Sequence, residues 1–351
     1  MAFSEEIIQW YVQHKRDLPW RNTTDPYIIW LSEIILQQTR VEQGLPYFVR
    51  FIEQFPTVKD FAEASEDQIL RLWQGLGYYS RARNMHQAAK TVMEVYDGLF
   101  PTHYETLLNL KGIGEYTAAA IASFSANEAQ AVVDGNVYRV LARYLGCDEP
   151  INSNQGKKLF GRLANQMLHR TQPALYNQAI MEFGALQCKP QNPYCVQCPL
   201  QTDCYALREN KVDFLPVKLK AKPARTRYFY YFILREEEQI AIQKRGSKDI
   251  WENLYEFPMI EMENPTTLLA LQESERFQEM FGEQVELKLL SQPKKHLLSH
   301  QHIYASFIEL RYIKKCNKKN TWNYVFLKDL DTLAKPKLIY TFLREYHICN
   351  N

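Results

Sequence analysis

Four cysteines, Cys188, Cys195, Cys198 and Cys204, follow the spacing C-x6-C-x2-C-x5-C in this 351-residue chain. Thiols packed this closely along a chain normally bind a metal centre, which constrains how the surrounding loop can fold. Structural zinc sites usually use two short C-x2–4-C pairs, and only Cys195 and Cys198 form such a pair. The spacing therefore favours a [4Fe–4S] cluster, with structural zinc and an electron-transfer centre as alternatives.

Composition indicates a soluble globular protein. Hydrophobic residues make up 46% of the sequence and charged residues 23%, and at roughly 150 residues per domain we expect about two domains. The sequence has no apolar run long enough to span a membrane, and Glu5 and Glu6 stand where a secretory signal carries positive charge. We therefore expect a cytoplasmic protein whose cysteines are not a disulfide framework.

The first part of the chain, residues 1–212, has the pattern of an all-α domain. One helical rhythm runs over residues 27–39 and follows Asp25 and Pro26, an N-cap followed by proline at the first helical position. Another runs over residues 136–145 and is closed by Gly146.

Residues 213–227 are predicted to be a basic linker, because the run PVKLKAKPARTR contains five basic residues and no acid. Beyond it, RYFYYFIL, QIAIQKR and HIYASFIELRYI are β-branched and aromatic runs that predict strands. A helix is expected over residues 266–280. The predicted fold class is therefore multi-domain, with an α+β domain over residues 228–351 after the all-α domain.

A glycine-containing turn separates two helical segments within residues 104–124. Its residues are Lys111, Gly112, Ile113 and Gly114. Glycines permit a tight turn, and amides exposed at the start of the second helix favour an anion. We expect Lys111, Gly112 and Gly114 to bind a DNA phosphate; the alternative is an ordinary turn between helices.

Two carboxylates are candidates for catalysis. Glu33 lies inside an apolar helical segment, where a desolvated carboxyl has the raised pKa that a general acid needs. The alternative places Glu33 on a polar face with a partner such as Arg40. Asp134 directly precedes a helix, so capping alone explains it, although a capping Asp is also held rigidly and stays ionised.

The segments WLSEIILQQT, GLGYYSRARN, LKGIGEYTAAAI and VVDGNVYRVLAR precede the four cysteines in this order. Together they resemble the helix-hairpin-helix, iron–sulfur DNA glycosylases, and among them the adenine DNA glycosylases of the MutY type. The resemblance implies base excision repair, in which adenine mispaired with 8-oxoguanine or guanine is removed from duplex DNA by acid-assisted hydrolysis. It also implies a [4Fe–4S] cluster in loop 188–204 and a monomer without a membrane partner, associated with the nucleoid of a bacterial-type cytosol.

The resemblance assigns roles to the catalytic candidates. Glu33 protonates adenine, Asp134 stabilises the cationic sugar, Tyr116 positions these carboxylates and Asn136 helps to hold the water. Related enzymes that also cleave the strand carry at the position of Tyr116 a lysine that forms a Schiff base. A tyrosine cannot do this, so we expect a monofunctional glycosylase.

Other residues resemble the family's DNA contacts. Gln38 resembles the wedge that fills the opened base stack, and Tyr78 the aromatic beside the opposing oxidised guanine. Arg16, Trp20 and Gln178 align with positions around the adenine pocket.

Residues 228–351 resemble the family's Nudix-like domain, through IWENLYEFP and KHLLSHQHIY. In the family a Phe-Ser-His run reads 8-oxoguanine, and here the run is Leu298-Ser299-His300. Leu298 removes an aromatic ring that would stack, whereas Ser299 and His300 keep the hydrogen-bonding groups. Residues 275–284 lack the paired acids of a Nudix hydrolase box, so pyrophosphate hydrolysis is not expected.

Two other functions remain open. An iron–sulfur glycosylase/lyase acting on oxidised pyrimidines, similar to endonuclease III, is disfavoured by Tyr116 and by the second domain. A non-catalytic lesion sensor would use the cluster and the Nudix-like domain for binding alone.

Overall fold

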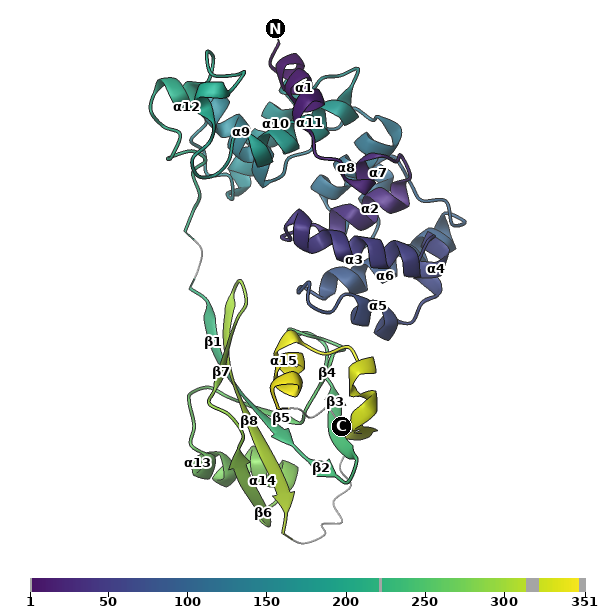
Figure 1. Ribbon diagram of the computed structural model, residues 1–351, viewed down its shortest axis with the longest axis vertical. Helices are drawn as coiled ribbons and strands as arrows, with labels where there is room; N and C mark the ends of the chain where they lie inside the picture. Colours follow the sequence, from purple (N-terminus) through teal and green to yellow (C-terminus); the bar gives the residue numbers. More distant parts are fainter. Residues whose placement is uncertain (1, 221–222, 314–321, 347–351) are drawn as a thin grey trace. The chain divides into compact units, whose positions relative to one another are not determined.

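The computed structural model describes residues 2–220, 223–313 and 322–346 (Figure 1). These residues fall into two compact units. We call them the helical unit, within Met1–Ala64 and Arg83–Lys220, and the sheet unit, within Ser65–Ala82 and Ala221–Asn351. In the described part of the chain, no helix has the length and apolar character needed to cross a bilayer.

The helical unit is built from short helices around a buried apolar core that includes Trp10, Leu141 and Phe183. Two 3-10 turns, η1 (Pro19–Arg21) and η2 (Cys195–Gln197), supplement the helices. The helices are α1 (Phe3–His14), α2 (Pro26–Ile35), α3 (Val41–Gln54), α4 (Val58–Glu63), α6 (Ser80–Val95, beginning in the sheet unit), α7 (Tyr104–Leu107), α8 (Glu115–Ala126), α9 (Gly135–Leu145), α10 (Asn154–Met167), α11 (Pro173–Leu186) and α12 (Tyr205–Arg208).

The expected helix ends are present where the sequence carries capping residues. Asp25 accepts a hydrogen bond from the backbone N–H of Tyr27 at the start of α2, and Gly146 ends α9 in the left-handed conformation, with φ 71°. Helix α2 ends at Ile35, before the expected limit near residue 39, because the chain turns there and Gln38 has φ 56°.

The sheet unit contains helix α5 (Glu66–Leu72) and two sheets. One sheet has the order β5-β1-β8-β6, with β7 also paired to β8; the other has the order β2-β3-β4, with β9 paired to β3. Only the β1–β8 pair is parallel among the described pairs. The strands are β1 (Arg225–Ile233), β2 (Arg235–Glu236), β3 (Gln239–Lys244), β4 (Tyr255–Glu256), β5 (Met259–Met262), β6 (Val285–Leu289), β7 (Lys294–Leu297), β8 (Gln301–Tyr312) and β9 (Asn323–Phe326).

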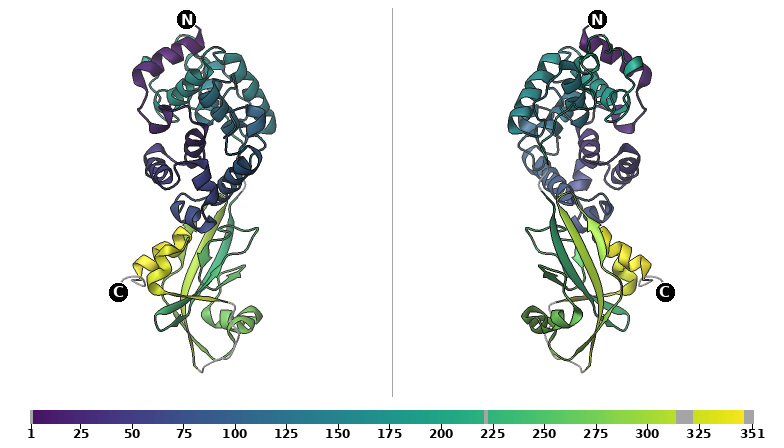
Figure 2. Two further views of the ribbon diagram at one scale, coloured as in Figure 1. Left: turned by 90° about the vertical axis from the view of Figure 1, so that its right-hand side faces the viewer. Right: turned by 90° about the vertical axis from the view of Figure 1, so that its left-hand side faces the viewer.

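Helices cover both faces of the sheet that contains β1 and β8 (Figure 2). On one face, Phe232 of β1 packs against Phe277 and Phe281 of α14 (Glu275–Phe281). On the other, Phe307 of β8 stacks on Phe342 of α15 (Lys337–Glu345), with ring centroids 3.8 Å apart. Since side chains alternate along a strand, the continuous apolar runs of β1 and β8 supply both cores.

Two further boundaries differ from the expectations. The helix predicted over 266–280 is divided into α13 (Leu268–Glu273) and α14, because Ser274 is extended and caps α14 through the backbone N–H of Phe277. The basic linker was predicted to extend to residue 227, but β1 already begins at Arg225.

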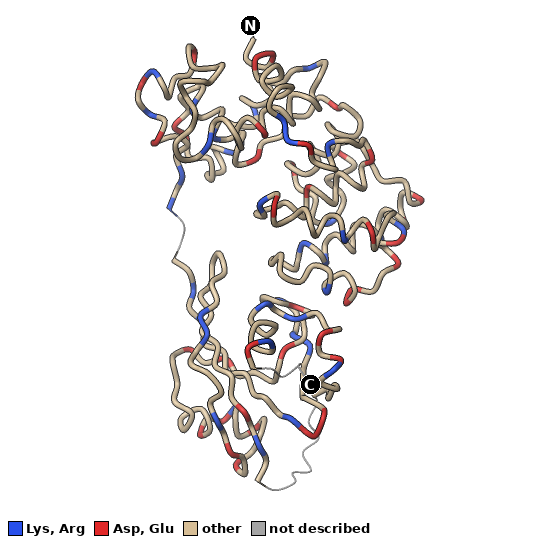
Figure 3. Tube along the Cα trace, in the orientation of Figure 1, with Lys and Arg blue, Asp and Glu red and all other residues tan. Residues whose placement is uncertain are grey.

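Lys and Arg residues recur along the segment that leads into β1 and along this strand (Figure 3). One of them, Arg227, is buried and pairs with Asp249 at 2.7 Å and with Glu261 at 2.6 Å. Arg227 therefore stabilises the sheet unit internally and does not contribute an exposed charge.

Candidate active site

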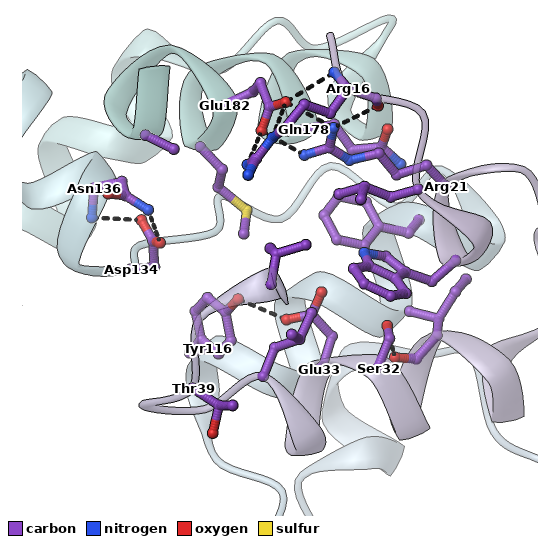
Figure 4. A pocket seen from close by; sticks show the side chains of 18 residues that line it. Arg16, Arg21, Ser32, Glu33, Thr39, Tyr116, Asp134, Asn136, Gln178 and Glu182 are labelled. Atoms are coloured by element: carbon purple, nitrogen blue, oxygen red, sulfur yellow. Dashed lines mark hydrogen bonds and ion pairs between the residues drawn. The ribbon is translucent and has the colours of Figure 1, made fainter. Parts of the chain in front are cut away.

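One cavity of about 190 Å³ in the helical unit gathers seven of the predicted site residues. Helices α2, α8, α9 and α11 and the segment around η1 contribute its walls (Figure 4). The seven residues are Arg16, Trp20, Glu33, Tyr116, Asp134, Asn136 and Gln178.

Glu33 is buried in α2, with 8% of its surface exposed. The hydroxyl of Tyr116, in α8, donates a 2.6 Å hydrogen bond to Glu33 Oε2. Burial raises the pKa of Glu33 to about 7; the Tyr116 hydrogen bond and Arg21 oppose this shift, and Asp134 adds to it. The alternative of a polar helix face is therefore wrong, and Glu33 can hold a proton near neutral pH.

Asp134 caps α9 and is held by its own helix. Its Oδ1 accepts hydrogen bonds from the backbone N–H groups of Asn136 at 2.8 Å and Val137 at 2.7 Å, and its Oδ2 accepts one from the Asn136 side chain at 2.8 Å. Burial raises the pKa of Asp134, whereas these donors and the charge of Arg139 oppose the rise. Both readings of Asp134 are compatible, because the capping geometry also orients the carboxylate that lines the cavity.

Arg139 connects this carboxylate to the cysteine loop. Its guanidinium donates hydrogen bonds to Asn136 Oδ1 at 2.8 Å, to the carbonyl of Gly184 at 2.6 Å and to the carbonyl of Cys188 at 2.7 Å. Because Asn136 also donates to Asp134, Arg139 restrains the amide that orients the carboxylate.

Sequence reasoning missed Arg21 and Glu182, which also line the cavity. Both oxygens of Glu182 accept hydrogen bonds from Arg16 and Arg21, with ion-pair distances of 2.7 and 2.8 Å. Burial alone would raise the pKa of Glu182, but these hydrogen bonds lower it to about 2. The signal that found Glu33, a glutamate in an apolar helical run, was also present around Glu182.

Trp20 and Gln178 complete the polar and aromatic lining. Trp20 is buried with its ring edge-on to Phe48, and Gln178 Oε1 accepts a 2.9 Å hydrogen bond from the Tyr11 hydroxyl. The indole is thereby held in the cavity wall, and the Gln178 amide is fixed in orientation.

The predicted phosphate-binding turn lies between α7 and α8. Gly112 has φ 81°, and a Cβ at this position would lie 2.7 Å from Asn84 Cβ. Gly114 is the N-cap of α8, a helix of 12 residues, and Lys111 is exposed. The first helical segment is shorter than expected, because α7 ends at Leu107 and the chain continues in turns.

The predicted lesion contacts lie in two places. In the helical unit, Gln38 occupies the turn after α2 and does not line the cavity. In the sheet unit, the hydroxyl groups of Tyr78 and Ser299 are hydrogen-bonded to each other, and Ser299 and His300 are exposed between β7 and β8. Tyr78 also has a left-handed backbone, with φ 46°.

The four predicted cysteine ligands line a second, smaller cavity together with Arg143. Arg143 donates to Cys188 Sγ at 3.4 Å and to the carbonyls of Lys189 and Pro190. Across the described residues, no three His, Cys, Asp or Glu side chains converge as ligands of a single ion. The four thiols thus share one cavity.

Two protein-family models match successive parts of the chain, and the first includes residues 65–82, which belong to the sheet unit. Residues 31–166 match the HhH-GPD superfamily of base excision DNA repair proteins, and residues 230–345 match the NUDIX domain. The adenine DNA glycosylase of Buchnera aphidicola subsp. Baizongia pistaciae (strain Bp) is 34% identical over 328 residues, covering 92% of this chain and 91% of that protein.

The chain belongs to the adenine DNA glycosylase family. Membership confirms the expected class of enzyme, an adenine-specific DNA glycosylase, and the expected combination of helix-hairpin-helix and Nudix-like domains. The human adenine DNA glycosylase is 43% identical over 216 residues, which cover 58% of this chain and 39% of the human protein.

Solved structures support the fold of the helical part. A thermostable thymine-DNA glycosylase covers 59% of this chain and 95% of its own, with a TM-score of 0.55 and 28% identity. Endonuclease III in a non-covalent DNA complex covers 59% of this chain and 94% of its own, with a TM-score of 0.51 and 19% identity, and so bears on the fold alone.

Proposed function

We propose that this adenine DNA glycosylase removes adenine opposite 8-oxoguanine or guanine and leaves an intact abasic strand. The observation that carries the proposal is a single cavity containing a buried Glu33 with a pKa near 7 and a second carboxylate, Asp134. Cleavage of an N-glycosidic bond builds negative charge on the leaving base and positive charge on the sugar. Two carboxyl groups in different environments can divide this work.

Glu33 is proposed as the general acid. Its proton passes to N7 of the flipped adenine while the bond from C1′ to the base breaks and its electron pair goes to the base. Tyr116 positions the Glu33 carboxyl through the hydrogen bond to Oε2.

Asp134 is proposed to stabilise the cationic sugar. Three N–H donors orient its carboxylate and favour the ionised form. Asn136, which supplies two of these donors, helps to hold the water that attacks C1′. The adenine would be bordered by Arg16, Trp20 and Gln178, which line the same cavity.

Residues in turns between helices and between strands are proposed to contact DNA. The α7–α8 turn, with Lys111, Gly112 and Gly114, suits a phosphate at a helix N-terminus. Gln38 would fill the space left by the flipped base, and Tyr78, Ser299 and His300 would contact the opposing 8-oxoguanine. The hydrogen bond between Tyr78 and Ser299 supports a shared role for these two residues.

Cys188, Cys195, Cys198 and Cys204 are proposed to hold a [4Fe–4S] cluster. All four thiols line one cavity, and their C-x6-C-x2-C-x5-C spacing favours a cluster over a structural zinc ion. When bound, the cluster would cross-link loop 188–204 through four thiolate bonds. Arg143, beside Cys188, would offset part of the negative charge.

The test is a single-turnover incubation with labelled duplex DNA carrying adenine opposite 8-oxoguanine, divided into alkali-treated and untreated halves. Strand breakage only after alkali is the expected result. Breakage in both halves would contradict the monofunctional assignment. No breakage in either half, from protein that retains its iron, would favour a lesion sensor.

A further inference from the structure

Glu182 binds both arginines of the cavity wall. Its Oε1 accepts hydrogen bonds from the backbone N–H and Nε of Arg16 and from Nη1 of Arg21, and its Oε2 accepts one from each guanidinium. Only 1% of the Glu182 side chain is exposed, and Figure 4 shows both arginines directed at it. A buried carboxylate and two partly exposed guanidinium groups thus form a charged cluster in the cavity that contains the proposed acid.

Charged and titratable groups from several elements line the cavity that contains Glu33. The segment around η1 contributes Arg16 and Arg21, and α11 contributes Glu182. The remaining groups are the Tyr116 hydroxyl from α8, Asp134 at the start of α9, and Glu42 of α3, which acts on Arg16. Without Glu182, the cavity wall would carry the charges of Arg16 and Arg21 with no carboxylate paired to them, and Arg21 already acts on Glu33.

A cation near a buried carboxyl favours its ionised form, which cannot act as an acid. Arg21 already opposes protonation of Glu33. The carboxylate of Glu182 offsets this charge, because it pairs with both guanidinium groups at hydrogen-bonding distance. The same pairing reduces repulsion between the wall and the positive charge that develops on the sugar.

We propose that Glu182 is a positioning residue that offsets one of the two positive charges of Arg16 and Arg21 and thereby lets Glu33 keep its proton for catalysis. This inference rests on the proposed function, because it requires Glu33 to be the general acid. It assigns Glu182 an electrostatic role that a merely structural ion pair would not have.

The test is the pH dependence of the single-turnover rate, measured with saturating enzyme so that DNA binding does not limit the rate. In wild type the rate should fall as pH rises through the pKa of Glu33. In Glu182→Gln, the midpoint of this fall should move to lower pH by about one unit, and the rate should approach the wild-type value at low pH. The double variant Arg21→Gln/Glu182→Gln should return the midpoint toward wild type.

A rate loss in Glu182→Gln that is uniform at all pH values, with an unchanged midpoint, would overturn the inference. If Glu182→Gln does not fold, Arg21→Gln carries the test, because loss of this cation should move the midpoint upward and an unmoved midpoint rejects the idea. Failure of the proposed function is distinguishable: the wild-type fall would then be absent, or Glu33→Gln would remain fully active.

Discussion

Two walls of the same cavity hold buried glutamates whose pKa values are shifted in opposite directions. Glu33 is 8% exposed and has a pKa raised to about 7, whereas Glu182 is 1% exposed and has a pKa lowered to about 2. Burial disfavours the charged form of both. Glu33 receives one hydrogen bond from a neutral phenol, and Glu182 receives bidentate hydrogen bonds from two guanidinium groups. The two guanidinium partners of Glu182 outweigh the effect of burial on its pKa, whereas the single phenol partner of Glu33 does not.

The largest effect is expected for Glu33→Gln, which keeps a hydrogen-bond acceptor for Tyr116 but removes the acid. The single-turnover rate of adenine release should fall roughly 10²–10⁴-fold, because this is the usual contribution of a positioned general acid. Duplex binding, measured by titration, should remain close to wild type. Full activity in this variant would mean that Glu33 is not the general acid.

Asp134→Asn is expected to have the next largest effect. Asparagine is also a good N-cap, so α9 should persist while the negative charge near the sugar is lost. We expect the rate to fall about 10²–10³-fold, as for loss of a preorganised electrostatic contact. Circular dichroism provides the folding control, and near wild-type cleavage would remove Asp134 from the mechanism.

The two glutamates should also affect stability with opposite pH dependence. The folded state binds the Glu33 proton more tightly than the unfolded chain does, so stability should fall as pH rises from 4.5 to about 7. For Glu182 the folded pKa is lower, so its contribution is present above pH 4.5 and is lost as pH falls toward about 2.

Glu33→Gln should therefore raise the free energy of unfolding above pH 7 by up to about 3 kcal/mol and change it little near pH 4. Denaturant unfolding at the two pH values measures this difference. An equal effect at both would indicate that Glu33 does not retain its proton in the folded state.

Tyr116→Phe is expected to have the smallest effect. The Tyr116 hydrogen bond lowers the pKa of Glu33, so its loss should move the alkaline fall of the rate to higher pH. The maximal rate should decrease only about tenfold, because one hydrogen bond of roughly 1.5 kcal/mol is lost. A shift of the pH profile to lower pH would contradict the assigned role of the phenol.

Local sequence patterns predicted much of the fold. Asp25, Asp134 and Gly146 mark helix ends because capping depends on a few neighbouring residues. The apolar runs of β1 and β8 likewise indicated strands. The same patterns did not place the interruption at Ser274, because a serine in a helical run is compatible with both a helix interior and a new N-cap.

The sequence by itself determined the family, the paired domains, the candidate acid within an apolar helix and the four closely spaced thiols. Only the tertiary structure decided that Tyr116 donates to Glu33 across 83 positions of the chain, and that Glu182 binds Arg16 across 166. Periodicity and capping act over a few residues, whereas proton affinity depends on charges that folding brings together from distant helices. For that reason Glu33 and Glu182, which both lie in apolar helical runs, have pKa values shifted in opposite directions in one cavity.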